Sequence, residues 1–141
     1  MRKIKYILID SDTQNDNRKS GYHGKSDIRH QPSSIFSYHY VFDSEGVVLQ
    51  PTDINQPGSF MPKPARGQED PNQCAIGIKY NGTLKRETCN LELRALLISL
   101  LLDLRDHYPE AKILGLSEYD RYHIKVSDDM NQLRRELSDY L

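Results

Sequence analysis

The chain has 141 residues, of which 37% are apolar and 28% are charged, and its formal net charge is −1. This composition is typical of a folded globular protein, and the length suits one domain spanning residues 1–141. A net charge this close to zero excludes the strongly basic surface that attracts nucleic acid. We therefore expect no nucleic-acid partner.

The cysteine content and the apolar runs indicate which cellular compartment the chain is expected to occupy. The two cysteines, Cys74 and Cys89, are too few for a disulfide framework or a cysteine-rich metal site. No apolar run approaches the roughly 18 residues that a membrane span needs, so no membrane partner is expected. The N-terminal apolar run is short and interrupted, and no small-residue cleavage site follows it. As encoded, the chain is expected to be cytoplasmic, without a signal peptide.

The first fifty residues predict a strand, a long loop and a hairpin. The apolar run over residues 4–9 ends at Asp10 and suits a strand buried on both faces. Residues 11–34 predict a polar loop with a short helical turn at residues 27–30. Aromatic and β-branched residues from 36 to 42, the turn residues 43–46 and the run 47–49 together predict a hairpin.

Within the hairpin, Tyr38 and His39 are neighbours. Successive side chains of a strand point to opposite faces, so we expect one of the two to lie in a core and the other to face outward. For His39 a hydrogen-bonded core position is favoured over a metal-ligand role, and Tyr38 is then the outward-facing residue.

The second half of the chain predicts alternating strands and helices. Five prolines between residues 51 and 71 exclude a helix or a central strand there. Residues 74–80 predict a strand that ends at the turn dipeptide Asn81-Gly82, and residues 112–115 predict a second strand. Residues 91–104 predict a helix capped by Thr88 or Asn90 and ended by Tyr108-Pro109. Its buried face is expected to comprise Leu93, Leu96, Leu97, Leu100 and Leu104.

A last helix is predicted from the spacing of Met130, Leu133, Leu137 and Leu141, with Ser127 as its N-cap. One hairpin together with one helix-connected strand indicates a mixed sheet. The expected fold class is α/β (α+β): a single domain with a central mixed sheet of about five strands flanked by helices.

Asp10 and Asp12 are the first candidates for chemistry. Paired acids after a buried strand are typical of phosphatases that use an aspartate nucleophile and Mg²⁺. Here Thr13 follows the second acid directly, whereas that family places a Thr or Val two residues after it. A strand-end acid that caps the next turn is the favoured interpretation. No two of the histidines are spaced as a helical metal-binding pair.

Five pieces, taken in order, resemble the zinc-dependent N-acetylmuramoyl-L-alanine amidases of the phage-lysozyme and peptidoglycan-recognition-protein type. They are the opening strand at residues 2–9, the Ser37-Tyr-His-Tyr-Val41 hairpin with its turn at residues 43–46, the strand at residues 74–80, the long helix at residues 93–97, and Tyr108–Gly115. The resemblance implies an amidase-like domain. It also implies that Tyr38 lies near the catalytic water of the family and that Lys125 matches the lysine that stabilises the oxyanion.

The chain departs from the family where the family binds zinc. The resemblance places Asp10, Leu116 and Ser127 at the three ligand positions, where the family has two histidines and a cysteine or comparable ligand. Leucine has no lone pair, and a neutral serine hydroxyl is a poor zinc ligand beside a thiolate. We therefore expect no zinc or other cofactor, and vestigial roles for Tyr38 and Lys125. We also expect the positions of Asp10, Leu116 and Ser127 to converge in the fold.

The resemblance thus implies a degenerate domain, catalytically weak or inactive, that binds peptidoglycan fragments or a protein partner. The alternative is an active peptidoglycan amidase with an atypical metal site, for which Asp10, Asp12 and His123 are the candidate ligands. In either case, action on a cell wall would require lysis or another export route.

Overall fold

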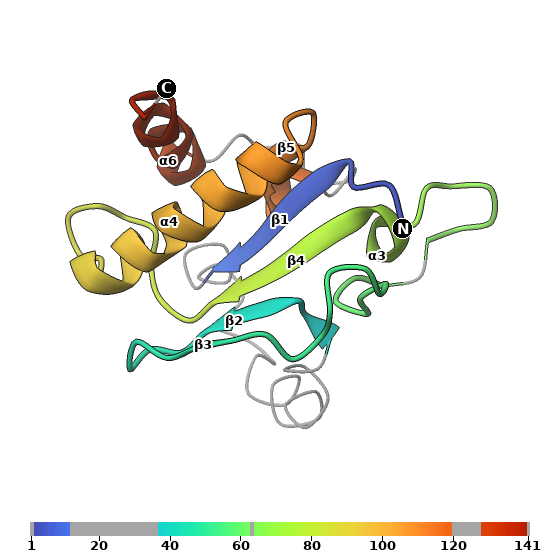
Figure 1. Ribbon diagram of the computed structural model, residues 1–141, viewed down its shortest axis with the longest axis horizontal. Coiled ribbons are helices and arrows are strands. Elements are labelled where there is room, and N and C mark those ends of the chain that lie inside the picture. Colours follow the sequence, from blue (N-terminus) through green and yellow to red (C-terminus); the bar gives the residue numbers. More distant parts are fainter. Residues whose placement is uncertain (1, 12–36, 63, 120–127, 141) are drawn as a thin grey trace.

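A five-stranded sheet forms the centre of the computed structural model, which describes residues 2–11, 37–62, 64–119 and 128–140 (Figure 1). The strand order is β3-β2-β4-β1-β5. The strands are β1 (Tyr6–Ser11), β2 (Tyr40–Phe42), β3 (Val48–Leu49), β4 (Ala75–Tyr80) and β5 (Lys112–Gly115). All are parallel except β3, which pairs antiparallel with β2 through the predicted hairpin. The predicted mixed sheet is confirmed.

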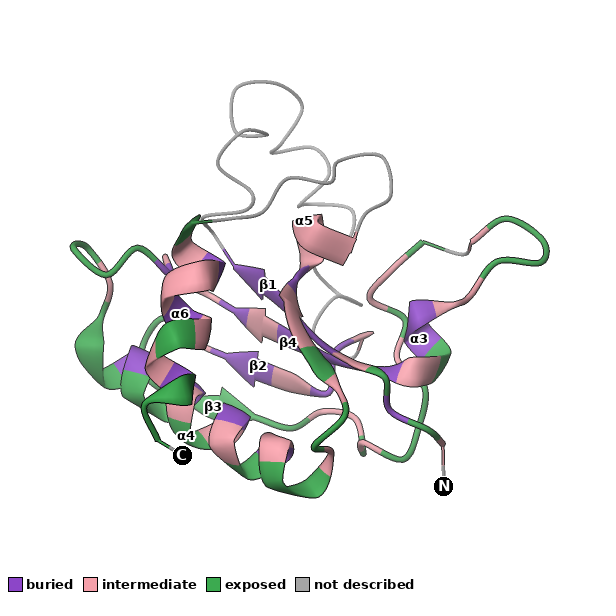
Figure 2. Cartoon of the chain, turned by 90° about the horizontal axis from the view of Figure 1, so that it is seen from above, coloured by how far each residue is buried: buried purple, intermediate pink, exposed green. Residues whose placement is uncertain are grey.

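Helices α3 (Pro71–Cys74), α4 (Leu91–His107), α5 (Leu116–Tyr119) and α6 (Asp128–Ser138) complete the described elements. Figure 2 shows α4 and α6 on one side of the sheet and α5 on the other. The short helices α3 and α5 were not predicted, because four-residue helices show no hydrophobic periodicity. The predicted turn at residues 27–30 and most of the loop over residues 11–34 lie outside the described residues.

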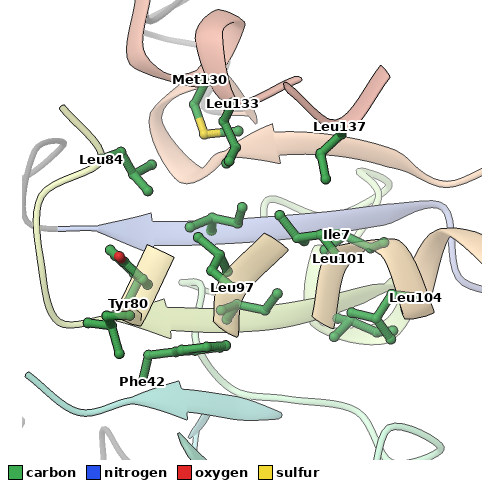
Figure 3. Close-up of a cluster of buried hydrophobic side chains, with 14 of the residues drawn as sticks. Ile7, Phe42, Tyr80, Leu84, Leu97, Leu101, Leu104, Met130, Leu133 and Leu137 are labelled. Atoms are coloured by element: carbon green, nitrogen blue, oxygen red, sulfur yellow. The ribbon is translucent and has the colours of Figure 1, made fainter. Parts of the chain in front are cut away.

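The core fills the space between the sheet and the two long helices (Figure 3). Ile7 and Ile9 of β1 and Ile76 and Ile78 of β4 point into it, and each is fully buried. Burying an aliphatic side chain of this size contributes about 1.5–3 kcal/mol. The expectation of a first strand buried on both faces is confirmed, since β1 is buried from Ile7 to Ser11.

Helix α4 buries three of the five leucines predicted for its core face, Leu93, Leu97 and Leu104, but it buries Leu101 in place of Leu96 and Leu100. The buried leucines are Leu93, Leu97, Leu101 and Leu104. Leu96 is 43% exposed, and Leu100 is only partly buried. The periodicity of a helix with leucines on several sides leaves the choice of stripe to tertiary packing, and here the sheet contacts the stripe centred on Leu97 and Leu101.

The ends of α4 follow local rules. Asn90 is the N-cap, and its side-chain oxygen accepts a 3.1 Å hydrogen bond from the Leu93 amide. The helix ends at His107, with Tyr108 as the C-cap, because the residue before Pro109 is pushed out of the α region. Asn90 rather than Thr88 is therefore the cap, and the helix continues past the predicted end at residue 104.

Helix α6 packs with the predicted face inward, since Met130, Leu133 and Leu137 are buried. The predicted cap, Ser127, and the last leucine, Leu141, lie outside the described residues. Between residues 50 and 70 the described residues contain no helix or strand, as the prolines predict. None of the helices in the described part of the chain has both the length and the apolar character to cross a bilayer.

Candidate functional site

The face of the sheet opposite α4 and α6 carries polar side chains from its two central strands. Since Ile9 and Ile78 point into the helix-side core, the adjacent residues Asp10 and Lys79 point to the other face. The parallel register pairs Asp10 with Lys79 directly. We call this the second face of the sheet.

Asp10, Tyr38 and Lys79 meet on the second face. The Tyr38 hydroxyl donates a 2.6 Å hydrogen bond to Asp10 Oδ2, a short distance typical of a charge-assisted bond. The Lys79 ammonium lies 3.7 Å from the same oxygen and 5.6 Å from the centre of the Tyr38 ring. The carboxylate is almost fully buried, whereas the Lys79 side chain is 27% exposed. Within this Asp10–Tyr38–Lys79 cluster, the lysine balances the carboxylate charge, and the tyrosine provides a donor.

Phe60 holds Tyr38 in place. The two rings stack with centres 5.6 Å apart, and the Phe60 ring also covers the backbone of Gly77 in β4. A Cβ at position 77 would lie 2.6 Å from Phe60 Cδ1, so the ring reaches this depth only because the residue is glycine. Gly58 allows the same close approach from the loop. The aromatic stack therefore depends on two glycines.

His39 connects the loop to the sheet. Its Nδ1 accepts a 3.0 Å hydrogen bond from the Gly77 amide, and Nε2 lies 2.7 Å from the Gln56 carbonyl oxygen. This pattern requires the proton on Nε2, because Nδ1 must accept and Nε2 must donate. Complete burial, with the nearby Arg2 guanidinium as a smaller factor, lowers the pKa of His39. The expected hydrogen-bonded core histidine is confirmed.

The expectation that Tyr38 and His39 point to opposite faces is wrong. Both rings contact Phe60, so both lie on the second face, and Tyr38, which was expected to face outward, is buried. Strand β2 begins only at Tyr40, and the side-chain alternation of a strand does not extend to the irregular residues before it.

Two of the three positions that the resemblance assigns to zinc ligands directly follow a paired position of the sheet. Ile9 of β1 pairs with Gly115 of β5; Asp10 continues β1, whereas Leu116 is the first residue of α5. Ser127 and Lys125 lie outside the described residues, as do Asp12 and His123. Within the described ranges, no three His, Cys, Asp or Glu side chains are grouped as a metal site would require.

A second polar group lies at the start of β1. Glu69 accepts hydrogen bonds from Lys5 at 2.7 Å and from Tyr119 at 3.1 Å, and the Tyr119 ring packs edge-on against Tyr6. The Lys5 hydrogen bond lowers the pKa of Glu69, and desolvation raises the pKa of Tyr119. These contacts attach the loop before α3 to β1 and α5, so we assign them a structural role.

Lys79, Phe60 and Gly77 were missed by reasoning from the sequence. Strand alternation could have found Lys79, because residues 75, 77 and 79 share one face and only Lys79 is charged. Phe60 had no local signal, since it lies in the proline-rich loop and acquires its role only by packing on Gly77.

No protein-family model matches the chain, and no curated protein matches it. The resemblance to the amidases therefore depends on the quoted sequence pieces.

Proposed function

We propose that this chain is an amidase-like domain that has lost the zinc site and binds peptidoglycan fragments on the second face of its sheet. The observation that carries this proposal is the environment of Asp10. At the position that corresponds to a zinc ligand in the family, the carboxylate receives a hydrogen bond from Tyr38 and is paired with Lys79. Its charge is compensated by side chains of the protein itself.

The residues at these positions do not fit a zinc ion. A catalytic zinc needs three protein ligands and one open position for water. Leu116 offers no lone pair, and the Lys79 ammonium would repel a cation placed against Asp10. The Tyr38 hydroxyl donates a hydrogen bond to Asp10 and so occupies one of the oxygens that a metal would need. This donor set supports the proposed loss of metal-dependent hydrolysis.

The second face keeps groups suited to a sugar–peptide ligand. The partly exposed ring of Phe60, which stacks on the buried ring of Tyr38, provides apolar surface for the C–H faces of sugars. Lys79 remains 27% exposed, which allows it to contact a carboxylate of a peptide. A few polar groups on a mainly apolar, aromatic surface are typical of small-ligand sites.

The proposal is tested by sedimentation with purified peptidoglycan. We expect the protein to be retained, and the retained fraction to fall for Lys79→Gln and Phe60→Ala. Lys85→Gln removes the same charge from an exposed residue outside the second face and is the matched control. Absence of retention for the unmodified protein contradicts the binding function.

Metal analysis and turnover distinguish the proposal from the active enzyme. We expect no stoichiometric zinc and no cleavage of a muramoyl-peptide. Stoichiometric zinc with metal-dependent cleavage would instead establish an amidase with an atypical site, with Asp10, Asp12 and His123 as the ligands to substitute first.

A further inference from the structure

A shallow hollow of about 200 Å³ lies on the helix side of the sheet, where α4, α6 and the loop before α4 meet. It is on the opposite side of the sheet from the Asp10–Tyr38–Lys79 cluster, since α4 and α6 cover the other face (Figure 2). A ligand in the hollow would therefore leave the second face accessible.

Two arginines and one glutamate form the charged part of the hollow. Arg94 is 2% exposed and donates hydrogen bonds to the Leu84 carbonyl oxygen and to Glu136. Its buried Nε has no hydrogen-bond partner among the described residues. Arg86 donates a 3.0 Å hydrogen bond to the other Glu136 oxygen, and its side chain is 55% exposed. Two guanidinium groups against one carboxylate leave an excess positive charge.

The remaining lining is apolar and accessible. Leu91 is 67% exposed and Tyr140 is 61% exposed, although both are large hydrophobic residues. Ala95 and Ile98 continue the apolar wall along α4, at the helical spacing that places them on the same side as Leu91. Single exposed apolar residues are ordinary, but a group of them around a charged hollow marks an interaction surface.

We propose that this hollow is the docking site for an acidic segment of a partner protein. An apolar side chain of that segment fills the space between Leu91, Ala95 and Ile98, and a neighbouring carboxylate pairs with the exposed guanidinium of Arg86. The choice of occupant follows from charge complementarity: a basic segment would be repelled by two arginines, and a purely apolar one would leave the excess positive charge of the two arginines over Glu136 unbalanced.

The test uses a short blocked peptide in which leucines are flanked by glutamates, and a matched peptide with glutamines instead. Amide chemical shifts of the full chain are followed by NMR up to about 1 mM peptide. We expect the acidic peptide to shift residues 86–98 and 136–140 and the glutamine peptide to bind more weakly. Arg86→Gln should weaken binding roughly five-fold, as expected for an exposed ion pair.

Ala95→Glu provides a second variant that should leave the fold intact, because residue 95 is exposed on α4. Its carboxylate should compete for Arg86 and abolish binding, whereas Arg135→Gln, exposed elsewhere on α6, should bind like the unmodified protein. The proposal is overturned if the hollow shows no shifts, if both peptides bind equally, if Ala95→Glu binds normally, or if the shifts map to the second face.

Discussion

The two faces of the sheet are built by different physical means. The helix-covered face is held by aliphatic side chains that alternate along β1 and β4 and by leucines along α4. The second face is held by polar and aromatic contacts, in which Asp10, Tyr38 and Phe60 each depend on a partner from another segment. On the helix-covered face, side chains can be placed approximately because hydrophobic burial is non-directional. On the second face, the hydrogen-bonding groups must lie at defined distances from one another.

This difference explains where function is expected. Hydrophobic burial on the helix side stabilises the fold without a particular geometry for any one contact. On the second face, the almost fully buried Asp10 side chain lies 3.7 Å from the ammonium group of the partly exposed Lys79. A buried charge is costly unless it is paired, so such an arrangement is retained where it serves a site or a defined structure.

The largest expected effect is on the helix-covered face. Leu97→Ala should lower the free energy of unfolding by about 2–5 kcal/mol, because it leaves a cavity at a fully buried position. Leu96→Ala, one residue earlier and 43% exposed, is the matched control and should cost far less. Denaturant titration measures both. Equal losses would contradict the assignment of the buried stripe.

On the second face, Gly77→Ala should cost about 1–3 kcal/mol, because the new methyl overlaps the Phe60 ring. In a Phe60→Ala background the overlap is absent, so the additional cost of Gly77→Ala should fall sharply. This double-mutant cycle, measured by denaturation, gives a direct coupling energy. If the stability losses of Gly77→Ala and Phe60→Ala simply add in the double variant, the Phe60 ring does not pack on Gly77.

Tyr38→Phe should lower stability by about 1 kcal/mol, because it removes the hydrogen bond to the Asp10 carboxylate. Tyr140→Phe removes a hydroxyl from an exposed tyrosine and should have little effect. In an Asp10→Asn background the loss should shrink, since the bond is no longer to a charged acceptor. An unchanged loss there would argue against the Tyr38–Asp10 bond.

The smallest expected effect on stability near neutral pH is that of substituting His39. Its pKa is lowered in the folded state, so the unfolded chain binds the proton more readily. The contribution of His39 to stability is present above the unfolded pKa of about 6.5 and is lost as pH falls towards the folded pKa.

Unfolding measured from pH 7.5 to pH 5 should therefore show a steeper fall for the unmodified protein than for His39→Gln. His107→Gln, at an exposed histidine, should keep the steep fall. Identical slopes for the unmodified protein and His39→Gln would remove His39 as the cause.

Local pattern alone predicted most of the elements in their order. The apolar run of β1, the hairpin turn at Gly46, the cap at Asn90 and the stop before Pro109 all depend on interactions within a few residues. Such interactions can be read directly from the order of residues. The same patterns predicted a mixed sheet and the buried face of α6.

Tertiary structure alone decided which residues meet. Tyr38 and Asp10 are 28 positions apart, and Arg94 and Glu136 are 42 positions apart. No local pattern links residues at such separations, so the partner of Asp10, the burial of Arg94 and the burial of Leu101 in place of Leu96 could not be predicted. The pairing of β1 with β4 and the packing of the loop on Gly77 bring them together. The sequence determined the elements because those interactions are local, and the tertiary structure decided the candidate site because its contacts are not.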